Sequence, residues 1–231
     1  MGGSSMSETL VIGKGLGRDF RDGTAGRITV LRDVDCEIVS GARIALVGPS
    51  GSGKSTLLHI LGGLDKQTTG TVEWPGLGSF EELRPRHIGF VFQTPSLFPA
   101  LTAVQNVELP LILGGKVPTD NATAMSLLDA FGLAEVADKL PEELSGGQAQ
   151  RVAMARALAI GPKLILADEP TGQLDSATAQ FFFDVVLKRL EDTGVALVVA
   201  THDEAVAARM ATRWTMDHGR LASGRLRNEA A

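Results

Sequence analysis

The chain has 231 residues, of which 44% are hydrophobic and 21% are charged, and its formal net charge is −5. These proportions are typical of a globular protein and exclude a disordered one. The acidic balance argues against broad nucleic-acid binding, which usually depends on a basic surface. A single cysteine, Cys36, excludes an intrachain disulfide and fits a reducing compartment. No apolar run approaches the roughly 20 residues that a bilayer-spanning helix needs.

The N-terminal part of the chain predicts short strands separated by turns. The stretch GGSS before Met6 is typical of a cloning leader, so we set residues 1–5 aside. The start has no basic-then-apolar signal pattern, and we expect a cytoplasmic protein. From 9 to about 47, β-branched runs alternate with turn signals at 22–26 (DGTAG) and 40–42 (SGA).

A change from strand to helix follows. The run RIALVG at 43–48 is almost continuously apolar, which predicts a strand that is buried on both faces. A helix is expected from Lys54, and the glycine pair 62–63 should stop it.

Residues 94 to about 160 predict a helical insertion, because their apolar residues recur at helical spacing. The start of its second helix is expected at Thr119-Asp120, two residues that commonly precede a helix. Three segments carry the pattern: TAVQNVELPLIL, TDNATAMSLLDAFGL and AQRVAMARALAI.

Strands return in the C-terminal part. KLILAD (163–168) and VALVVATHD (195–203) have buried-strand patterns, and they flank the predicted helix SATAQFFFDVVLKRLED, which we expect Gly194 to end. A hairpin should turn at His218-Gly219. Strands that alternate with helices predict an α/β core built on a parallel sheet.

The sequence GPSGSGKST at 48–56 fits the phosphate-loop pattern G-x-x-x-x-G-K-[ST] and lies between an apolar strand and a helix, as that motif requires. Glycines let the backbone fold around phosphate oxygens, where a Cβ would obstruct it. Lys54 supplies a positive charge to the outer phosphates, and Ser55 offers its hydroxyl to magnesium. The alternative is a strand–helix turn that matches by chance. The predicted binding residues are Gly48, Pro49, Ser50, Gly51, Ser52, Gly53, Lys54, Ser55 and Thr56.

Two adjacent carboxylates, Asp168 and Glu169, stand where the buried strand KLILAD ends. Ligands of open α/β sheets collect at the carboxyl ends of the strands, so these side chains should meet the phosphates. Asp168 would hold Mg²⁺, usually through water, and Glu169 would polarise the attacking water. The alternative is a solvated acidic pair that caps the strand.

LSGGQ at 144–148 places a serine and two glycines just before a predicted helix, which is one way in which a chain presents N–H groups to an anion. With QRVAMARAL directly after it, and with the phosphate loop and the Asp-Glu pair, the chain resembles the ATP-binding subunit of ABC transporters from about residue 9 to 225. The resemblance implies an α/β fold: a P-loop NTPase (RecA-like) core with a parallel sheet, an N-terminal antiparallel β subdomain and an inserted α-helical subdomain. The implied boundaries are 6–93 and 161–231 for the core with its β subdomain, and 94–160 for the helical signature subdomain.

The resemblance also assigns roles to single residues. Gln93, in FVFQ, would contact magnesium and the attacking water, and His202 would touch the γ-phosphate. Asp175, in GQLD, would cross a dimer interface, although it also stands where a helix N-cap belongs. A histidine at a strand end is usually structural, and ion pairing at the surface is the default expectation for Arg151 and Arg156. The implied catalytic residues are Glu169, His202 and Gln93, and the implied magnesium ligands are Ser55, Gln93 and Asp168.

Two copies of such a chain would pack head to tail around two MgATP. Ser145, Gly146, Gly147 and Gln148 of one copy would then bind the γ-phosphate of the ATP held by Lys54 of the other copy. ATP would become part of the interface, and its hydrolysis would remove the contact.

The chain departs from the family pattern in several places. The family generally stacks adenine on a tyrosine, and this chain has none, so Phe20 in RDFRDG is the best match. Stacking needs an aromatic face and no hydroxyl, and it is worth about 1–3 kcal/mol per base. Gln173 replaces a common Asn, Ala149 a frequent Gln, and Gln105 a usual Glu. None of these changes removes a group that the chemistry needs.

The phrases LLHILGGLDKQTTGTV and ADEPTGQLD resemble the branch of macrolide-exporter, lipoprotein-release, cell-division and haem-exporter ATPases. That branch implies a homodimer on the inner face of the cell membrane, driving two copies of a separate four-helix permease, with no nucleic-acid partner. Export of a hydrophobic or amphipathic cargo is the expectation, and a signalling ATPase that regulates cell-wall hydrolases is the alternative. A soluble member acting on DNA or ribosomes would carry a coiled-coil insertion or a second cassette. The apolar stretch SLFPALTA (96–103) is either core or the groove for the permease.

Overall fold

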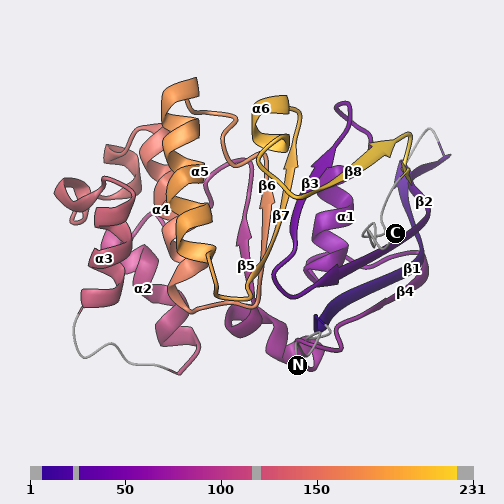
Figure 1. Cartoon of the computed structure of the whole chain (residues 1–231), viewed down its shortest axis with the longest axis horizontal. Helices are drawn as coiled ribbons and strands as arrows, with labels where there is room; N and C mark the ends of the chain where they lie inside the picture. The colour runs from indigo at the N-terminus through magenta and orange to yellow at the C-terminus, as the bar shows by residue number, and fades with distance from the viewer. Residues whose placement is uncertain (1–6, 23–25, 116–120, 223–231) are drawn as a thin grey trace, which may run out of the picture.

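Two sheets enclose one short helix in the right half of the view in Figure 1. The computed structural model describes residues 7–22, 26–115 and 121–222. The larger sheet has the order β5-β6-β7-β3-β8-β9, in which all neighbouring pairs are parallel except β8 and β9. Its strands are β3 (Arg43–Val47), β5 (Ile88–Val91), β6 (Leu164–Asp168), β7 (Ala196–Thr201), β8 (Thr212–Asp217) and β9 (Arg220–Leu221). The α/β core with a parallel sheet that the sequence predicts is therefore confirmed.

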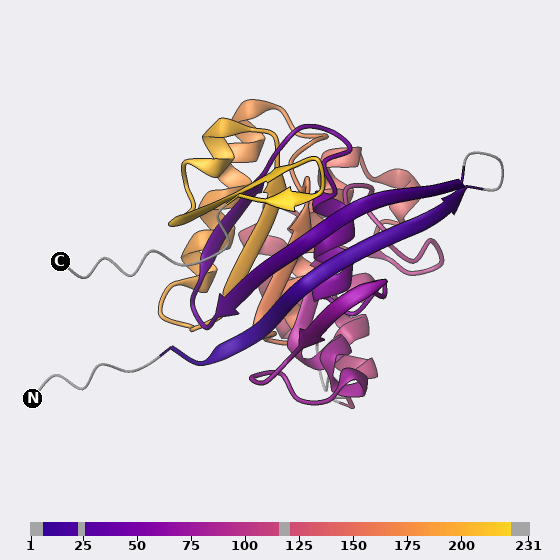
Figure 2. The same ribbon diagram turned by 90° about the vertical axis from the view of Figure 1, so that its right-hand side faces the viewer.

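The smaller sheet is antiparallel, with the order β2-β1-β4. Figure 2 shows β1 and β2 as a long hairpin that crosses the molecule. The strands are β1 (Thr9–Asp22), β2 (Gly26–Val39) and β4 (Thr69–Glu73). This sheet is the predicted N-terminal antiparallel subdomain.

The prediction of short strands in this part was wrong, since β1 and β2 each have 14 residues. Their pairing shifts register several times, for example between Gly13 and Leu16, where Gly15 has a φ of 57°. Such irregularities bend a strand without ending it, so turn-like residues lie inside the strands. Within the predicted turn DGTAG, residues 23–25 lie outside the described residues, and the turn at Ser40-Gly41 is confirmed.

The helices cover the two faces of the larger sheet. Helix α1 (Lys54–Leu61) lies between the sheets, and it begins and ends where the sequence predicts. The other face packs against the helices on the left of Figure 1. They are α2 (Ala103–Leu113), α3 (Ala122–Ala130), α4 (Gly146–Ala159) and α5 (Ser176–Leu190), and α6 (Glu204–Ala207), at the top centre of that view, joins the same apolar cluster. Single turns of 3-10 helix occur at Phe80–Glu82, Ala134–Val136 and Pro141–Glu143, and an irregular turn occupies Leu83–His87.

Alternation along the strands explains why both faces are covered. In β3, Ile44 and Leu46 join the apolar cluster around α1, whereas Ala45 and Val47 join the cluster formed with α2 to α6. Successive side chains of a strand point to opposite faces, so an unbroken apolar run needs a layer on each side. The three predicted helices of 94–160 are confirmed as α2, α3 and α4, and the boundaries of that subdomain stay a prediction.

Three details at element ends qualify the sequence analysis. Helix α5 ends at Leu190 and not at Gly194, because Thr193 Oγ1 and Arg43 donate hydrogen bonds to the Leu190 carbonyl (3.0 and 2.7 Å). The predicted helix start at Thr119-Asp120 lies outside the described residues. The hairpin at His218-Gly219 is confirmed, and both residues have positive φ (44° and 79°), as a tight two-residue turn requires.

Candidate functional site

The phosphate loop joins the end of β3 to the start of α1. Its first glycine is required by packing as well as by any ligand, because a Cβ on Gly48 would lie 2.2 Å from the carbonyl oxygen of Met216 in β8. Gly53 has a φ of 103°, and its Cβ would lie 2.9 Å from the Val30 carbonyl oxygen in β2. The loop therefore fits tightly against two strands that the sequence pattern did not connect with it.

Lys54 is only 8% exposed. Its ammonium group donates hydrogen bonds to the carbonyls of Gly48 (2.8 Å) and Pro49 (3.1 Å). These contacts hold a positive charge inside the curve of the loop, where an anionic group would meet it.

A cavity of about 360 Å³ opens beside the loop. It lies at the carboxyl ends of three parallel strands, since Gln93 follows β5, Asp168 ends β6 with Glu169 directly after it, and the loop follows β3. Its lining consists of Val30, Ser50, Gly51, Gly53, Lys54, Ser55, Thr56, Gln93, Asp168 and Glu169. The sequence analysis found all of these except Val30, which comes from the separate sheet.

Asp168 is 5% exposed and accepts a hydrogen bond from Ser55, while its Oδ1 has no partner among the described residues. Burial raises the pKa of this carboxyl group above its ordinary value. Magnesium is often held by one or two carboxylates together with hydroxyl, water and phosphate oxygens. The orphaned oxygen beside the Ser55 hydroxyl fits that donor set. No cluster of three or more His, Cys, Asp or Glu side chains that could hold a metal ion occurs in the described ranges.

Glu169 combines a strained backbone with a held side chain. Its φ of 46° is unusual for a residue with a Cβ, and such strain costs about 1–3 kcal/mol. Its Oε2 lies 2.8 Å from Nδ1 of His202, which follows β7. The glutamate side chain is 13% exposed and that of His202 is 74% exposed. His202 is therefore no core histidine, and it contacts the residue that lines the cavity.

The LSGGQ turn forms the start of α4. Ser145 is the N-cap, and its hydroxyl accepts a hydrogen bond from the Gln148 backbone (3.2 Å), while Gln148 Oε1 accepts one from the Ser145 backbone (2.8 Å). Ser145 and Gly146 are exposed. None of residues 145–148 lines the cavity beside the phosphate loop.

Comparison with known proteins shows which family has this combination of sites. The sequence profile of the ABC transporter family matches residues 31–172. The chain belongs to the ABC transporter family. It is 44% identical over 224 residues to the lipoprotein-releasing system ATP-binding protein LolD of Legionella pneumophila (strain Paris), covering 94% of this chain and 98% of that protein. The LolD protein of Roseobacter denitrificans is 43% identical over 224 residues, with 94% and 99% covered.

Solved structures of an ABC cassette agree with the fold. The dimeric ATP-binding cassette MJ0796 bound to ADP and Pi in a post-hydrolysis state is similar with a TM-score of 0.85 and 39% identity, over 93% of this chain and 97% of that one. A second dimeric structure of MJ0796 gives a TM-score of 0.84 at 39% identity, with the same coverage. The chain is thus an ABC ATPase, which hydrolyses ATP in a reaction coupled to transport. Among the described residues, no helix is long and apolar enough to cross a membrane.

The glycines of the ABC signature have a packing role that sequence reasoning missed. A Cβ on Gly146 would lie 2.6 Å from Gln173 Oε1, and one on Gly147 would lie 2.8 Å from Leu174 Cδ2. The loop GQLD therefore rests directly on the signature turn of the same chain.

Asp175 caps helix α5, as one of its two interpretations predicts. Its carboxylate accepts hydrogen bonds from the backbone and hydroxyl of Thr178 (3.0 and 2.6 Å), which lowers its pKa. Its contact across an interface stays a prediction.

The expectation of surface ion pairs was wrong for Arg151, which donates to the carbonyls of Gly147 and Phe131. It was also wrong for Arg156, which donates to Ser96.

Phe20 lies on β1 and pairs with Ile28 of β2. Ile28 is two residues before Val30, which lines the cavity. It is 40% exposed, and the guanidinium carbon of Arg18 lies 4.4 Å from its ring centroid. Phe20 itself does not line the cavity, so its stacking on adenine stays a prediction.

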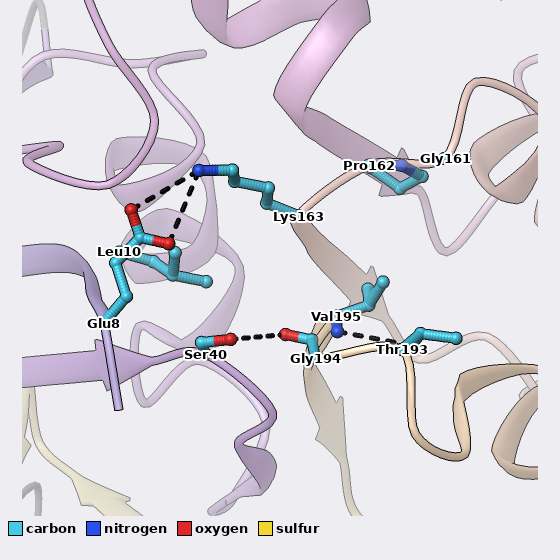
Figure 3. Close-up of a pocket in the computed structure, with 9 residues that line it drawn as sticks. All are labelled: Glu8, Leu10, Ser40, Gly161, Pro162, Lys163, Thr193, Gly194 and Val195. Atoms are coloured by element: carbon cyan, nitrogen blue, oxygen red, sulfur yellow. Dashed lines mark hydrogen bonds and ion pairs between the residues drawn. The ribbon is translucent and has the colours of Figure 1, made fainter. Parts of the chain in front are cut away.

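A second cavity, of about 280 Å³, lies at the amino ends of β6 and β7, away from the carboxyl ends that carry the phosphate loop and the carboxylates. Figure 3 shows the residues that line it. There Lys163 reaches across to the carboxylate of Glu8 (3.4 Å), and Ser40 donates to the Gly194 carbonyl (2.8 Å). The first bond joins the residue before β1 to the residue before β6, and the second joins the residue after β2 to the loop before β7. None of the predicted site residues lines this cavity.

The buried charge of Asp168 predicts a dependence of stability on pH. Because burial raises its pKa in the folded state, the ionised carboxylate lowers the free energy of unfolding. This loss of stability is absent below the unfolded pKa (~3.9) and fully present above the folded pKa. Asp168→Asn should therefore raise the melting temperature of nucleotide-free protein in EDTA at pH 7–8, by an amount that shrinks as the pH falls toward 4. The exposed Asp138→Asn is the control and should show no such gain. A gain that is absent at pH 7, or that grows on acidification, would contradict the assignment.

Proposed function

We propose that this chain is the ATPase of a lipoprotein-releasing type of exporter, and that two copies close head to tail around two MgATP to drive a separate membrane permease. The observation that carries the proposal is the separation of two phosphate-binding elements within one chain. The cavity beside Lys54 lacks every residue of the signature, while the signature turn is exposed. A second copy would complete each site. The dimeric MJ0796 structures support this arrangement, and the LolD relatives support the type of exporter.

The described residues divide the work of hydrolysis. Lys54 and the loop amides would bind the phosphates, and Ser55, Asp168 and Gln93 would hold Mg²⁺, which neutralises phosphate charge when bound. Glu169, oriented by His202, faces the same cavity and would accept the proton of the attacking water. His202 is exposed enough to reach the γ-phosphate as well.

The signature would act through its backbone. Ser145 to Gly147 begin a helix of 14 residues, so their N–H groups and the helix dipole favour an anion. Each such contact is worth about 0.3–2 kcal/mol, and several amides in two symmetric sites can shift a monomer–dimer equilibrium. Asp175, at the start of the neighbouring helix α5, would lie at the same interface.

The permease contact is proposed at residues 96–103. Phe98 is 52% exposed although its backbone is fixed by hydrogen bonds with the buried Asn106 side chain (2.8 and 3.1 Å). An exposed aromatic on a rigid segment suits a partner better than it suits a core. With two permease copies the chain would lie on the inner face of the cell membrane.

Glu169→Gln should leave ATP binding intact and slow hydrolysis by about 10²–10⁴-fold, because the amide cannot accept the proton. Nucleotide affinity and single-turnover rates measure the two effects separately. Lys54→Ala is the contrasting variant and should lose ATP affinity. Near-normal turnover by Glu169→Gln would remove Glu169 from the role of base.

ATP should bring two copies of the Glu169→Gln protein together, because hydrolysis no longer removes the shared phosphate. Light scattering coupled to gel filtration should report a dimer with ATP and a monomer with ADP. Adding Ser145→Arg, which blocks the start of α4, should abolish the dimer while ATP affinity remains. Monomer alone at saturating ATP would count against the sandwich.

The type of exporter is tested with the complex itself. The tagged chain would be purified together with its permease and placed in liposomes that carry a lipoprotein. ATP should release the lipoprotein from the liposomes, and the Glu169→Gln protein should not release it. ATP hydrolysis without release of lipoprotein would favour the signalling alternative.

A further inference from the structure

Gln93 stands on an irregular piece of chain that we call the Gln93 segment, residues 92–96. Strand β5 ends at Val91, so the segment begins just after the sheet's regular hydrogen bonding. Gln93 is exposed and lines the cavity beside Lys54. A side chain in such a position needs other contacts to fix its direction toward the cavity.

Gln150 supplies one of these contacts from helix α4. It is 1% exposed, and its Nε2 donates a hydrogen bond of 3.0 Å to the carbonyl oxygen of Phe92. Phe92 directly precedes Gln93, so this bond fixes the peptide from which Gln93 starts.

Arg156 supplies a second contact from the same helix. Its guanidinium donates to the Ser96 carbonyl (2.8 Å) and to the Ser96 hydroxyl (3.1 Å). Arg156 is partly buried, and this burial lowers the pKa of its guanidinium. The Gln93 segment is thus attached to α4 at both of its ends.

The burial of Gln150 is unfavourable for the fold alone. Its Oε1 is buried without a hydrogen-bond partner among the described residues, and its neighbours Ala149, Val152, Ala153 and Met154 are apolar and buried. An apolar side chain of the same length, such as methionine, would fill this space without an unpaired oxygen. A buried polar group that stability does not require is a candidate for function.

We propose that Gln150 and Arg156 are positioning residues for ATP hydrolysis, which hold the Gln93 segment so that the Gln93 side chain points into the nucleotide cavity. The inference rests on the proposed role of Gln93 at magnesium and water. Within the described part of the chain, the hydrogen bonds of these two side chains go to the Phe92 carbonyl and to the carbonyl and hydroxyl of Ser96, so they act on Gln93 through the segment that carries it. Since α4 also begins with the signature turn, one rigid helix carries both the signature and the support of Gln93.

The test is a double-mutant cycle on steady-state ATP hydrolysis. Gln150→Met keeps the length of the side chain and removes the donor to Phe92. It should lower kcat roughly three- to tenfold, with little change in the KM for ATP, because binding by the phosphate loop is untouched. In a Gln93→Ala background the same change should have no further effect, since Gln150 acts only through Gln93.

Arg156→Lys is the second arm, in case one variant folds poorly. It keeps the charge but lacks the forked pair of donors, and it should give the same split between kcat and KM and the same loss of effect in Gln93→Ala. Gln180→Met, the same chemical change on an exposed residue of α5, is the matched control and should leave kcat unchanged. Melting temperatures of all variants show whether each one is folded.

The outcomes separate this inference from the proposed function. Suppose that Gln93→Ala slows hydrolysis, and that Gln150→Met and Arg156→Lys lower kcat by the same factor in the Gln93→Ala background as in the wild-type background. The two residues then act elsewhere, and the inference is overturned. Wild-type kcat in both Gln150→Met and Arg156→Lys overturns it as well. If Gln93→Ala itself turns over normally, the proposed role of Gln93 fails first and the inference fails with it.

Discussion

The geometry of the nucleotide site depends on the burial of one short helix between two sheets. Helix α1 has eight residues, too few to be stable in isolation, and Leu57, Leu58, Ile60 and Leu61 are all 0% exposed. Apolar side chains from both sheets surround it, so its axis is fixed from two sides. The phosphate loop leads directly into this helix. Lys54 and Ser55 are therefore held against the end of β6, where Asp168 and Glu169 lie.

Several unfavourable features of the fold lie around this site. Native proteins pair nearly all buried polar atoms, yet Asp168 Oδ1, Ser52 Oγ and Gln150 Oε1 have no partner among the described residues. Glu169 adds a left-handed backbone. A stable core would not need any of these, and each belongs to the loop, the carboxylate pair or the helix that supports Gln93. The fold tolerates them because two large apolar clusters stabilise it from both faces of the sheet.

Helix α4 connects elements that lie far apart in the sequence. Its first turn touches Gln173 and Leu174 of the GQLD loop, and its next turns hold the Gln93 segment. The same helix belongs to the apolar cluster on this face of the larger sheet, in which Val152, Ala153 and Met154 are at most 1% exposed. A displacement of α4 would therefore reach the signature, the loop before α5 and Gln93 together. In the proposed dimer the signature turn and the GQLD loop would face the nucleotide held by the other copy, whereas Gln93 faces the chain's own nucleotide cavity.

The sequence by itself determined the fold class, the phosphate loop and the carboxylate pair, because each is a local pattern. A glycine-rich turn between an apolar strand and a helix can be recognised within about ten consecutive residues. The same is true of two acids at the end of a buried strand. The family resemblance predicted Gln93 and His202, and the position of Asp175 before a helical stretch predicted its cap. Tertiary structure alone decided the contacts between distant segments: Val30 in the cavity, Gly48 against Met216, and Gly146 against Gln173. It also decided that Arg156 binds Ser96 and not a surface acid, and that side chains of Thr193 and Arg43 end α5 before Gly194. Periodicity and motif spacing describe neighbours along the chain, whereas these contacts depend on which strands lie side by side and on how closely their backbones approach.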